Sequence, residues 1–336
     1  MVEWLYLSDI DRILSLNQAS AKSGLPVKAL EKDWWVTLTL KAVFESKFST
    51  HLSFKGGTSL SKCWNLIQRF SEDIDLSIER NFLGFAEELS KTQVKKLKRI
   101  AAAFTSLDLR SELEQKLINL GVPSHMFSIT AEPIPETMRD IDPQTLYINY
   151  HSLFEKVHYI TDSVKLEVSA RSLKEKGIEK PISSLLGEYM PGYTWSGSPF
   201  DVHSVLPERT FLEKIFLLHE EFLRPPEKIN YNRMSRHLYD LERMMDTEYG
   251  TKALSSFDYY NSIVIHRRKF IFKQGVDYET HQPHTLSFIP PETVIENYKN
   301  DYAQMVEQMI YGEEVLDFDT MIRRLSLLNE RIRKLQ

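Results

Sequence analysis

The chain has 336 residues, of which 42% are hydrophobic and 26% are charged, and its formal net charge is −5. This composition is typical of a globular protein, and the length favours two domains. The net negative charge excludes a protein that is basic over its whole surface, so any contact with nucleic acid would need local basic patches.

The sequence lacks the features of secreted and membrane proteins. Cys63 is the single cysteine, which excludes a disulfide framework and a thiolate zinc site. No apolar stretch has the length of a membrane span, and the residues from Met1 onward lack the basic and apolar segments of a signal peptide. We therefore expect a protein that works in the cytoplasm without contact with a membrane.

The first part of the chain alternates between helical and strand-like patterns. Two helices are expected between residues 8 and 48, with a break near Gly24–Pro26. A short strand at His51–Phe54 then leads into Gly56-Gly57, and a helix follows from about Ser59 to Gln68. This order predicts a strand, a glycine turn and a helix in succession.

The segment from Asp73 to Ile78 alternates strictly between polar and apolar residues. In a strand, this alternation places Asp73 and Asp75 on one face and the apolar residues on the other. A polar helical insertion is expected to follow at about residues 84–120. It carries a basic cluster at Lys91, Lys95, Lys96, Lys98 and Arg99.

Further strands are expected at Thr145–Leu153, Ser163–Ser169 and Val202–Leu206. In the second of these, Lys165 and Glu167 share one face while the apolar residues share the other. Strands that alternate with helices and turns predict a mixed sheet flanked by helices.

The pattern becomes helical from Pro207 onward. Helices are expected at about Phe211–Phe222 and Arg233–Met245, and a terminal helix carries an apolar stripe from Met321 to Leu335. We therefore predict an α+β protein with two domains. Residues 1–206 would form an α/β domain with the helical insertion, and residues 207–336 a mainly helical domain.

Three acidic residues form the pattern that carries chemistry: Asp73, Asp75 and Glu167. Nucleotidyl transfer requires neutralised phosphate oxygens and an attacking oxygen placed in line, and magnesium ions held by carboxylates can supply both. Two aspartates two residues apart on a strand point the same way, and an acidic residue on a neighbouring strand completes the ligand set. An Asp-x-Asp pair by itself is more often a solvated strand face, but its place after a glycine turn and a helix favours a metal–phosphate site.

The glycine turn offers contacts to a phosphate. Gly56 and Gly57 would let the backbone approach closely, and Thr58 and Ser59 would add hydroxyl donors at the start of a helix. By itself a Gly-Gly-Thr sequence is usually a structural turn, and it is not a Walker A loop because its spacing to a Lys-Ser/Thr pair is wrong. For Lys62, on the same helix, a solvated helix face is favoured, and contact with a phosphate is the alternative.

The chain resembles the AbiEii/AbiGii nucleotidyltransferase toxin family, a branch of the polymerase-beta-like superfamily. The resemblance lies first in Phe54-Lys-Gly-Gly-Thr-Ser-Leu60 and Arg69-Phe-Ser-Glu-Asp-Ile-Asp-Leu76. Further blocks occur in the family's order over nearly the whole chain: Glu31-Lys-Asp-Trp-Trp35, Lys165-Leu-Glu-Val168, Pro207-Glu-Arg-Thr-Phe-Leu-Glu-Lys214 and Ser235-Arg-His-Leu-Tyr-Asp-Leu241. The second glycine and the long spacing between Gly57 and Asp73 differ from the pattern of the wider superfamily, but both features occur in this branch.

The resemblance implies that residues 1–206 form the nucleotidyltransferase domain and that residues 207–336 contribute to the active-site cleft. It also implies roles for individual residues. Asp73 and Asp75 would bind magnesium, with manganese as the alternative ion, and Glu167 would be a third ligand or the base for the acceptor hydroxyl. Lys214 would contact the phosphates of the nucleotide, and Asp240 would lie near the nucleotide or the acceptor.

Several of these positions have a structural alternative. Lys214 lies in an otherwise apolar helical turn, so it needs a counter-charge or a phosphate unless its side chain snorkels to the surface. Arg236 and Asp240 stand four residues apart, so they form either a helix salt bridge or part of the nucleotide site. Arg69 and Ser71 can orient the first aspartate or a phosphate, or cap the strand.

Other candidates have weaker patterns. His281 and His284 have no further ligand nearby in the sequence, which indicates a loop rather than a metal site. His237 is expected to pack within its helix, and Trp34 and Trp35 in the core. The basic residues between 91 and 99 form either a solvated helix face or one of the few patches able to bind RNA, and His266-Arg-Arg-Lys269 is another such patch.

We predict a nucleotidyltransferase that moves NMP from an NTP to an acceptor hydroxyl and releases pyrophosphate. The resemblance implies an RNA acceptor, with a tRNA 3′ end as the expected one, and a role as the toxin of a bacterial toxin–antitoxin or phage-defence system. The antitoxin would be encoded separately and need not bind the toxin directly. Two alternatives stay open: a protein or small-molecule acceptor, as in nucleotidylylating antibiotic-resistance enzymes, and a catalytically silent nucleotide-binding scaffold.

Overall fold

The structure, a computed structural model, describes residues 1–86, 88–135, 142–155, 160–171, 176–271, 273, 275–311 and 315–335. The chain folds as two compact units. The first unit comprises Met1–Cys63 and Phe70–Val205, and the second comprises Trp64–Arg69 and Leu206–Gln336. The short segment Trp64–Arg69 therefore belongs to the second unit, although its sequence pattern predicts that it continues a helix of the first.

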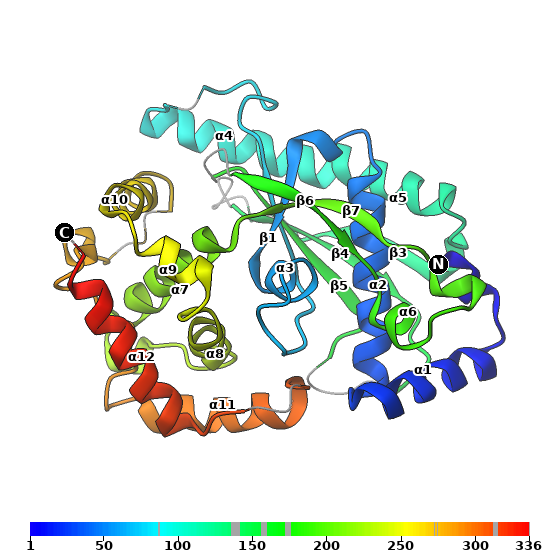
Figure 1. The fold of residues 1–336 in the computed structure, drawn as a ribbon. Coiled ribbons are helices and arrows are strands. Elements are labelled where there is room, and N and C mark those ends of the chain that lie inside the picture. The colour runs from blue at the N-terminus through cyan, green and yellow to red at the C-terminus, as the bar shows by residue number, and fades with distance from the viewer. Residues whose placement is uncertain are drawn as a thin grey trace. The chain divides into compact units, whose positions relative to one another are not determined.

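The described residues of the first unit contain a seven-stranded mixed sheet (Figure 1). Its strands are β1 Leu52–Lys55, β2 Ile74–Ile78, β3 Phe127–Ala131, β4 Gln144–Tyr150, β5 Ser163–Ser169, β6 Gly177–Ile182 and β7 Phe200–Val205. They lie in the order β3-β4-β5-β2-β1-β7-β6. β2 pairs with β5 and β1 with β7 in parallel, whereas the other neighbours are antiparallel. The predicted α+β class with a mixed sheet is confirmed.

One long buried helix organises the first unit. Its helices are α1 Asp9–Ser23, α2 Val27–Phe44, α3 Gly56–Lys62, α4 Lys91–Phe104, α5 Arg110–Asn119 and α6 Leu185–Tyr189. α2 is buried along most of its length because it packs against β5, β7, α1 and α5. Trp34 packs on Trp4 with ring centroids 4.8 Å apart, and Trp35 stacks on Tyr150 at 5.0 Å. Both tryptophans are buried, which confirms that they belong to the core.

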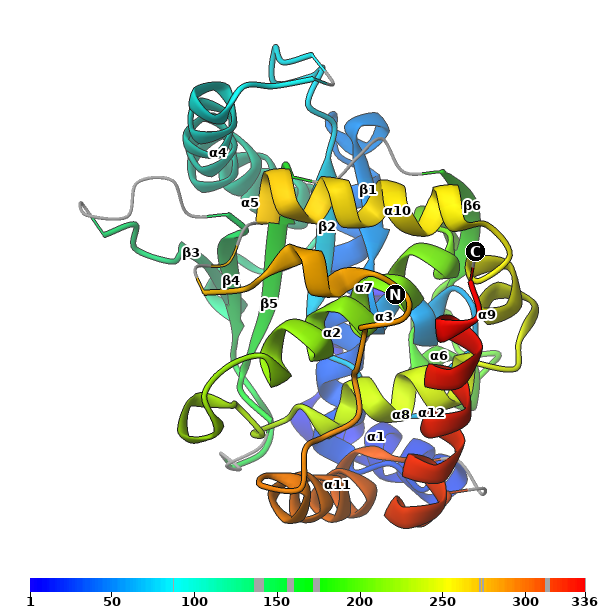
Figure 2. The ribbon, with the colours of Figure 1, turned by 90° about the vertical axis from the view of Figure 1, so that its left-hand side faces the viewer.

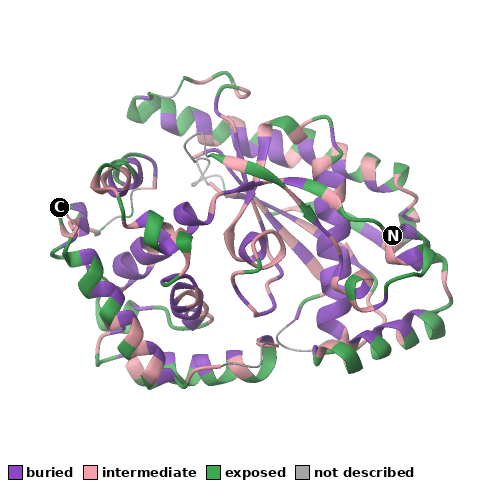
Figure 3. Ribbon diagram, viewed as in Figure 1, coloured by how far each residue is buried: buried purple, intermediate pink, exposed green. Residues whose placement is uncertain are grey.

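The predicted helical insertion forms α4 and α5, which are joined through a π-helical turn at Thr105–Leu109. Ser90 begins α4 with a capping box, in which its hydroxyl accepts from Gln93 N and the Gln93 side chain accepts from Ser90 N. Val94 and Leu97 are buried, whereas the basic residues of this helix lie mainly at the surface, so buried and exposed positions alternate along it (Figure 3).

The second unit is built from helices (Figure 2). They are α7 Pro207–Phe222, α8 Ser235–Met244, α9 Glu248–Ala253, α10 Phe257–His266, α11 Ile295–Met309 and α12 Phe318–Arg333. α7 packs against α8, α9 and α10, and α8 packs against α11 and α12. The apolar stripe of the terminal helix, at Met321, Leu325, Leu328 and Ile332, is buried within this unit as expected. Among the described helices, none combines the length and the apolar composition that a membrane span requires.

Backbone contacts hold the segment Trp64–Arg69 in the second unit. Tyr311 N donates a hydrogen bond of 3.1 Å to Gln68 O, and Arg69 forms an isolated bridge with Ile310. The prediction that the helix of the glycine turn continues to Gln68 was therefore wrong. The helix ends at Lys62, because the residues after it pack with the helical unit instead.

Candidate active site

Asp75 and Glu167 lie side by side on neighbouring strands of the sheet. In the parallel pairing of β2 with β5, Asp75 is the direct partner of Glu167, and Asp73 stands immediately before β2. Ile74 and Leu166, which alternate with these residues, are completely buried, so the acidic side chains point away from the apolar core. We call Asp73, Asp75 and Glu167 the acidic face.

Gly56 lies directly against one member of the acidic face. A β-carbon at Gly56 would lie 2.0 Å from Asp75 Oδ2, and Gly56 has a φ of +81°, which disfavours other residues. Only glycine leaves the space that the Asp75 carboxylate fills. The glycine turn and the aspartate strand are therefore one local structure, as the order of their motifs suggests.

Lys165 accompanies the acidic face on the same strand as Glu167. Its Nζ lies 3.0 Å from Glu167 Oε1. Partial burial opposes the charge on Lys165, but the neighbouring carboxylates of Glu167 and Asp73 outweigh it and raise the pKa of Lys165 above its usual value. Lys165 thus partly offsets the negative charge of this face.

The hydroxyl groups near the glycine turn bond within the protein. Thr58 Oγ1 donates to Asp73 O at 2.5 Å and lies 2.9 Å from Ser71 Oγ, in hydrogen-bonding distance. Ser59 Oγ lies 2.8 Å from Ser204 Oγ on β7. Thr58 and Ser71 therefore link the start of α3 to the backbone of the first aspartate, and the hydroxyl groups of Thr58 and Ser59 both have partners within the protein.

Lys62 is buried and paired with Asp33 of α2. Lys62 Nζ lies 2.6 Å from Asp33 Oδ1, and both side chains are almost fully shielded from solvent. Asp33 Oδ2 also accepts from Leu185 N at 2.7 Å. The favoured prediction of a solvated helix face for Lys62 was therefore wrong, since an ammonium group shielded from solvent needs a partner, which Asp33 provides.

The two residues before Asp33 also bond to segments far away in the sequence. Lys32 Nζ donates to Thr161 O at 2.8 Å and to Ser163 O at 2.5 Å, and it lies 3.3 Å from Glu72 Oε2. Glu31 instead accepts from the loop after β4. Because Glu72 immediately precedes Asp73 and Ser163 begins β5, Lys32 connects the two strands of the acidic face. The sequence identifies the motif that begins at Glu31 only through the family resemblance, and it does not predict the contacts of these residues.

A second group of predicted site residues lies within the helical unit. Arg69 donates to both oxygens of Asp240 at 2.7 Å each, and Lys214 Nζ lies 2.8 Å from Asp240 Oδ2. Asp240 is completely buried, and the two cations hold its pKa well below its usual value despite the opposing effect of burial. Asp240 is therefore an ionised carboxylate that holds two cations in place.

Lys214 is buried beside His237. Burial lowers the pKa of Lys214 against the opposing effect of Asp240, and Lys214 donates to His237 Nδ1 at 3.4 Å. Lys214 is 7% exposed, so the alternative in which it snorkels to the surface was wrong. Burial, together with the charges of Lys214 and Arg236, also lowers the pKa of His237 well below its usual value, which keeps this imidazole neutral.

The sequence also matches a known family. A family model described as nucleotidyl transferase AbiEii toxin, Type IV TA system, matches residues 39–324, which include every predicted site residue. The chain belongs to this family. It is thus a nucleotidyltransferase toxin of a type IV toxin–antitoxin system, which implies an NTP substrate and an antitoxin partner.

A solved structure supports the fold of this AbiEii-family chain. MenT4, the nucleotidyltransferase toxin Rv2826c from Mycobacterium tuberculosis H37Rv, aligns with a TM-score of 0.52 and 16% sequence identity. The alignment covers 98% of this chain and 91% of that chain. A search of curated protein sequences gave no match.

The acidic face of this family member fits a divalent metal in chemistry, and nucleotidyltransferases generally use divalent metals. Asp73, Asp75 and Glu167 are hard oxygen donors on one side of the sheet, as magnesium prefers. Within the described residues, however, no three His, Cys, Asp or Glu side chains converge so that they could hold an ion. The Glu167 carboxylate contacts Lys165 instead.

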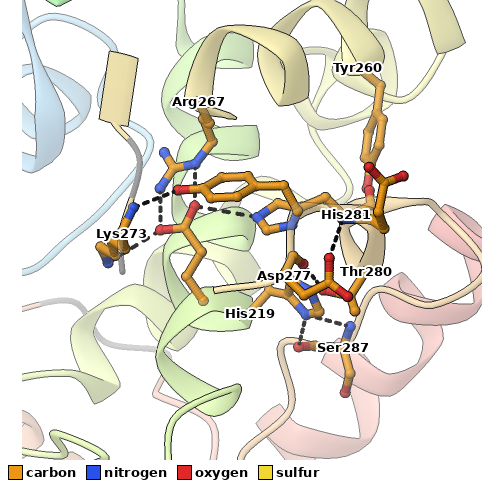
Figure 4. Close-up of polar contacts among 11 residues, drawn as sticks. His219, Tyr260, Arg267, Lys273, Asp277, Thr280, His281 and Ser287 are labelled. Carbon is orange, nitrogen blue, oxygen red and sulfur yellow. Dashed lines mark hydrogen bonds and ion pairs between the residues drawn. The ribbon is translucent and has the colours of Figure 1, made fainter. Parts of the chain in front are cut away.

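A polar cluster elsewhere in the helical unit, which includes Arg267, Lys273 and His281 (Figure 4), surrounds the buried carboxylate of Glu220. Arg267 donates to both oxygens of Glu220 at 2.7 and 2.8 Å, Lys273 Nζ lies 3.2 Å from Oε2, and His281 Nε2 lies 3.4 Å from Oε1. Among the residues that the structure describes, no group of side chains here could hold a metal ion. His281 ends a short 3₁₀ helix, Tyr278–His281, and is completely buried against Glu220.

Proposed function

We propose that the chain transfers NMP from an NTP to the 3′-terminal hydroxyl of a tRNA, with Asp73 and Asp75 as ligands of magnesium or manganese. The observation that carries this proposal is the contact between the Asp75 carboxylate and Gly56, in register with Glu167. It joins the acidic face to a glycine turn, where the backbone carries no side chain that would keep a phosphate away.

In the proposed reaction the acceptor hydroxyl oxygen attacks the α-phosphorus of the NTP. The bond from this phosphorus to the oxygen that bridges to the β-phosphate breaks, and pyrophosphate leaves. Glu167 takes the proton of the hydroxyl, or acts as a third metal ligand if another base takes it. When bound, the metal supplies charge neutralisation for the phosphate oxygens.

We assign phosphate binding in the helical unit to Lys214 and Arg236. Arg69 and Lys214 both contact the carboxylate of Asp240, and the charge of Arg236 acts on Lys214 nearby. Cationic side chains that gather in this way favour an anionic ligand. Asp240 has both oxygens bonded to cations, so its role in the proposal is to position Arg69 and Lys214.

Phosphate binding in the first unit is assigned to the turn at Gly56-Gly57. Because the hydroxyls of Thr58 and Ser59 bond internally, the contribution of these residues is proposed to come from their backbone. Lys62 and Ser71 support this turn through their contacts with Asp33 and Thr58.

An RNA acceptor is supported by the basic face of α4. Lys91, Lys95, Lys96 and Arg99 are exposed and make no ion pair with the residues that the structure describes. In a chain with a net charge of −5, this concentrates positive charge where a phosphate backbone could bind. Because NTPs and tRNA are cytoplasmic, the proposed reaction takes place in the cytoplasm, where an antitoxin encoded separately would oppose it without needing to bind the toxin.

The test is transfer of label from each of the four α-³²P-labelled NTPs to total RNA, purified tRNA or protein. We expect magnesium-dependent labelling of tRNA at its 3′ end, and loss of labelling in Asp73→Ala and Asp75→Ala. Asp201→Ala is the matched control, because this exposed carboxylate lies on β7 of the same sheet.

Each other outcome has a distinct meaning. Label that survives ribonuclease treatment would indicate a protein or small-molecule acceptor. Absence of transfer with all four NTPs would indicate a silent nucleotide-binding scaffold. Labelling by the aspartate variants at the wild-type rate would refute the assigned site.

A further inference from the structure

Lys165 and Glu167 form an ion pair at the edge of the acidic face. They stand two residues apart on β5, so their side chains share one face of the strand. Their charged atoms lie 3.0 Å apart, and the side chains are 37% and 24% exposed, respectively. The pair is thus partly shielded from water and yet accessible to a solute.

The strand register brings Lys165 close to a second carboxylate. β2 pairs with β5 so that Ile74 is the partner of Leu166 and Asp75 the partner of Glu167. Continued by one residue, this register sets Asp73 opposite Lys165. Lys165 is therefore beside both Asp73 and Glu167, the two ends of the acidic face.

Carboxylates on neighbouring strands repel one another unless a positive charge lies between them. We propose that Lys165 is a resident counter-cation of the acidic face, which holds Glu167 and competes for it with a divalent metal ion. This inference rests on the proposed metal site and goes beyond it, because it assigns to Lys165 a role that lowers metal affinity while stabilising the protein without metal.

The test measures binding of Mn²⁺ alone to the full chain, by electron paramagnetic resonance and without nucleotide. Lys165→Met is expected to bind Mn²⁺ about threefold more tightly than wild type, the ratio that a partly exposed ion pair supports. Without metal, the variant should melt at a lower temperature, so that Mn²⁺ raises its melting temperature more than that of wild type. Lys165→Arg keeps the charge and should bind Mn²⁺ like wild type.

Lys47→Met is the matched control. Lys47 Nζ also lies 3.0 Å from a glutamate, Glu112, in the same unit, and its loss changes the net charge of the chain equally. Mn²⁺ affinity should be unchanged in this variant. Equal tightening by Lys47→Met would show a general charge effect and would overturn the inference.

The result also separates this inference from the proposed function. If wild type binds Mn²⁺ and Asp73→Asn abolishes binding, but Lys165→Met binds no more tightly than wild type, the inference alone fails. If Asp73→Asn and Asp75→Asn bind Mn²⁺ as well as wild type, the proposed metal site fails and the inference falls with it.

Discussion

The carboxylate of Asp75 fills the space that a β-carbon would need at Gly56. A β-carbon there would lie 2.0 Å from Asp75 Oδ2, and the backbone of Gly56 has a φ of +81°. We predict that Gly56→Ala displaces Asp75 and lowers the rate of nucleotidyl transfer by about 100-fold, as a shift of about 1 Å at a reacting centre can do. The measurement is kcat/KM for the labelled NTP.

Gly24→Ala provides the control for backbone strain. Gly24 ends α1 with a φ of +73°, and no atom lies within 4 Å of a β-carbon placed there. Both substitutions should cost about 1–2 kcal/mol of stability from the left-handed backbone. If Gly56→Ala transfers nucleotide as fast as Gly24→Ala, the position of the Asp75 carboxylate does not determine the rate of transfer.

Local patterns predicted the strands of the acidic face but not all of the sheet. The alternation of three buried residues with polar ones predicted a strand at Ser163–Ser169, and β5 has the same bounds. β6 was not predicted because its residues are mostly not buried and include Pro181, which is typical of an edge strand. β3, the other edge strand, was missed as well.

The partners of the charged residues could not be predicted, because they come from distant parts of the chain. Sequence spacing offers Arg236 as the partner of Asp240, whereas the bidentate contact comes from Arg69, before β2. In the same way, the sequence predicts a solvated position for Lys62, because its partner Asp33 lies on α2, far away in the sequence. A local pattern places a charged residue on a helix, but its interaction partner is determined by the tertiary fold.

Because the contact between Arg69 and Asp240 is buried, we expect a large loss of stability when Arg69 is replaced. Arg69→Met leaves one carboxylate with less positive charge around it in a completely buried position. Breaking a buried pair in this way costs about 3–5 kcal/mol. Urea unfolding should show this loss, whereas Arg331→Met, which breaks a half-exposed pair with Asp246, should cost less than about 1 kcal/mol. Equal losses in the two variants would contradict the proposed burial.

Lys32 and Glu31 allow the support of the acidic face to be tested separately from the stability of α2. Both residues are 1% exposed, but only Lys32 contacts Glu72 and the start of β5, whereas Glu31 contacts the loop after β4. We expect Lys32→Met and Glu31→Gln to lose similar stability, about 2–4 kcal/mol. Only Lys32→Met should also lower kcat by about tenfold, as loss of a residue that supports metal ligands does.

This comparison needs kcat and KM at saturating magnesium, measured below the melting temperature of both variants. Lys32→Arg keeps the positive charge and should recover part of kcat. If kcat falls equally in Lys32→Met and Glu31→Gln, Lys32 contributes only to the stability of the helix.

His219 on α7 predicts a loss of stability in acid. Its Nδ1 accepts from Ser287 N at 3.1 Å and its Nε2 lies 3.0 Å from Thr280 Oγ1, which leaves no room for solvation of an imidazolium. Burial, with His281 nearby, lowers the pKa of His219 to about 4, although Ser287 O and Glu220 favour the charged form. Below the pH at which an unfolded histidine titrates, about 6.5, the unfolded state gains a proton that the folded state does not.

The free energy of unfolding should therefore be unaffected by His219 above pH 6.5 and should fall as the pH decreases from there to about 4. The shift corresponds to about 3 kcal/mol at most. Asn in place of His219 keeps an acceptor for Ser287 N but cannot gain a proton, so His219→Asn should lose less stability between pH 7 and pH 4.5 than wild type. Urea unfolding at the two pH values measures this difference, and equal losses in the two proteins would show that His219 does not titrate in this range.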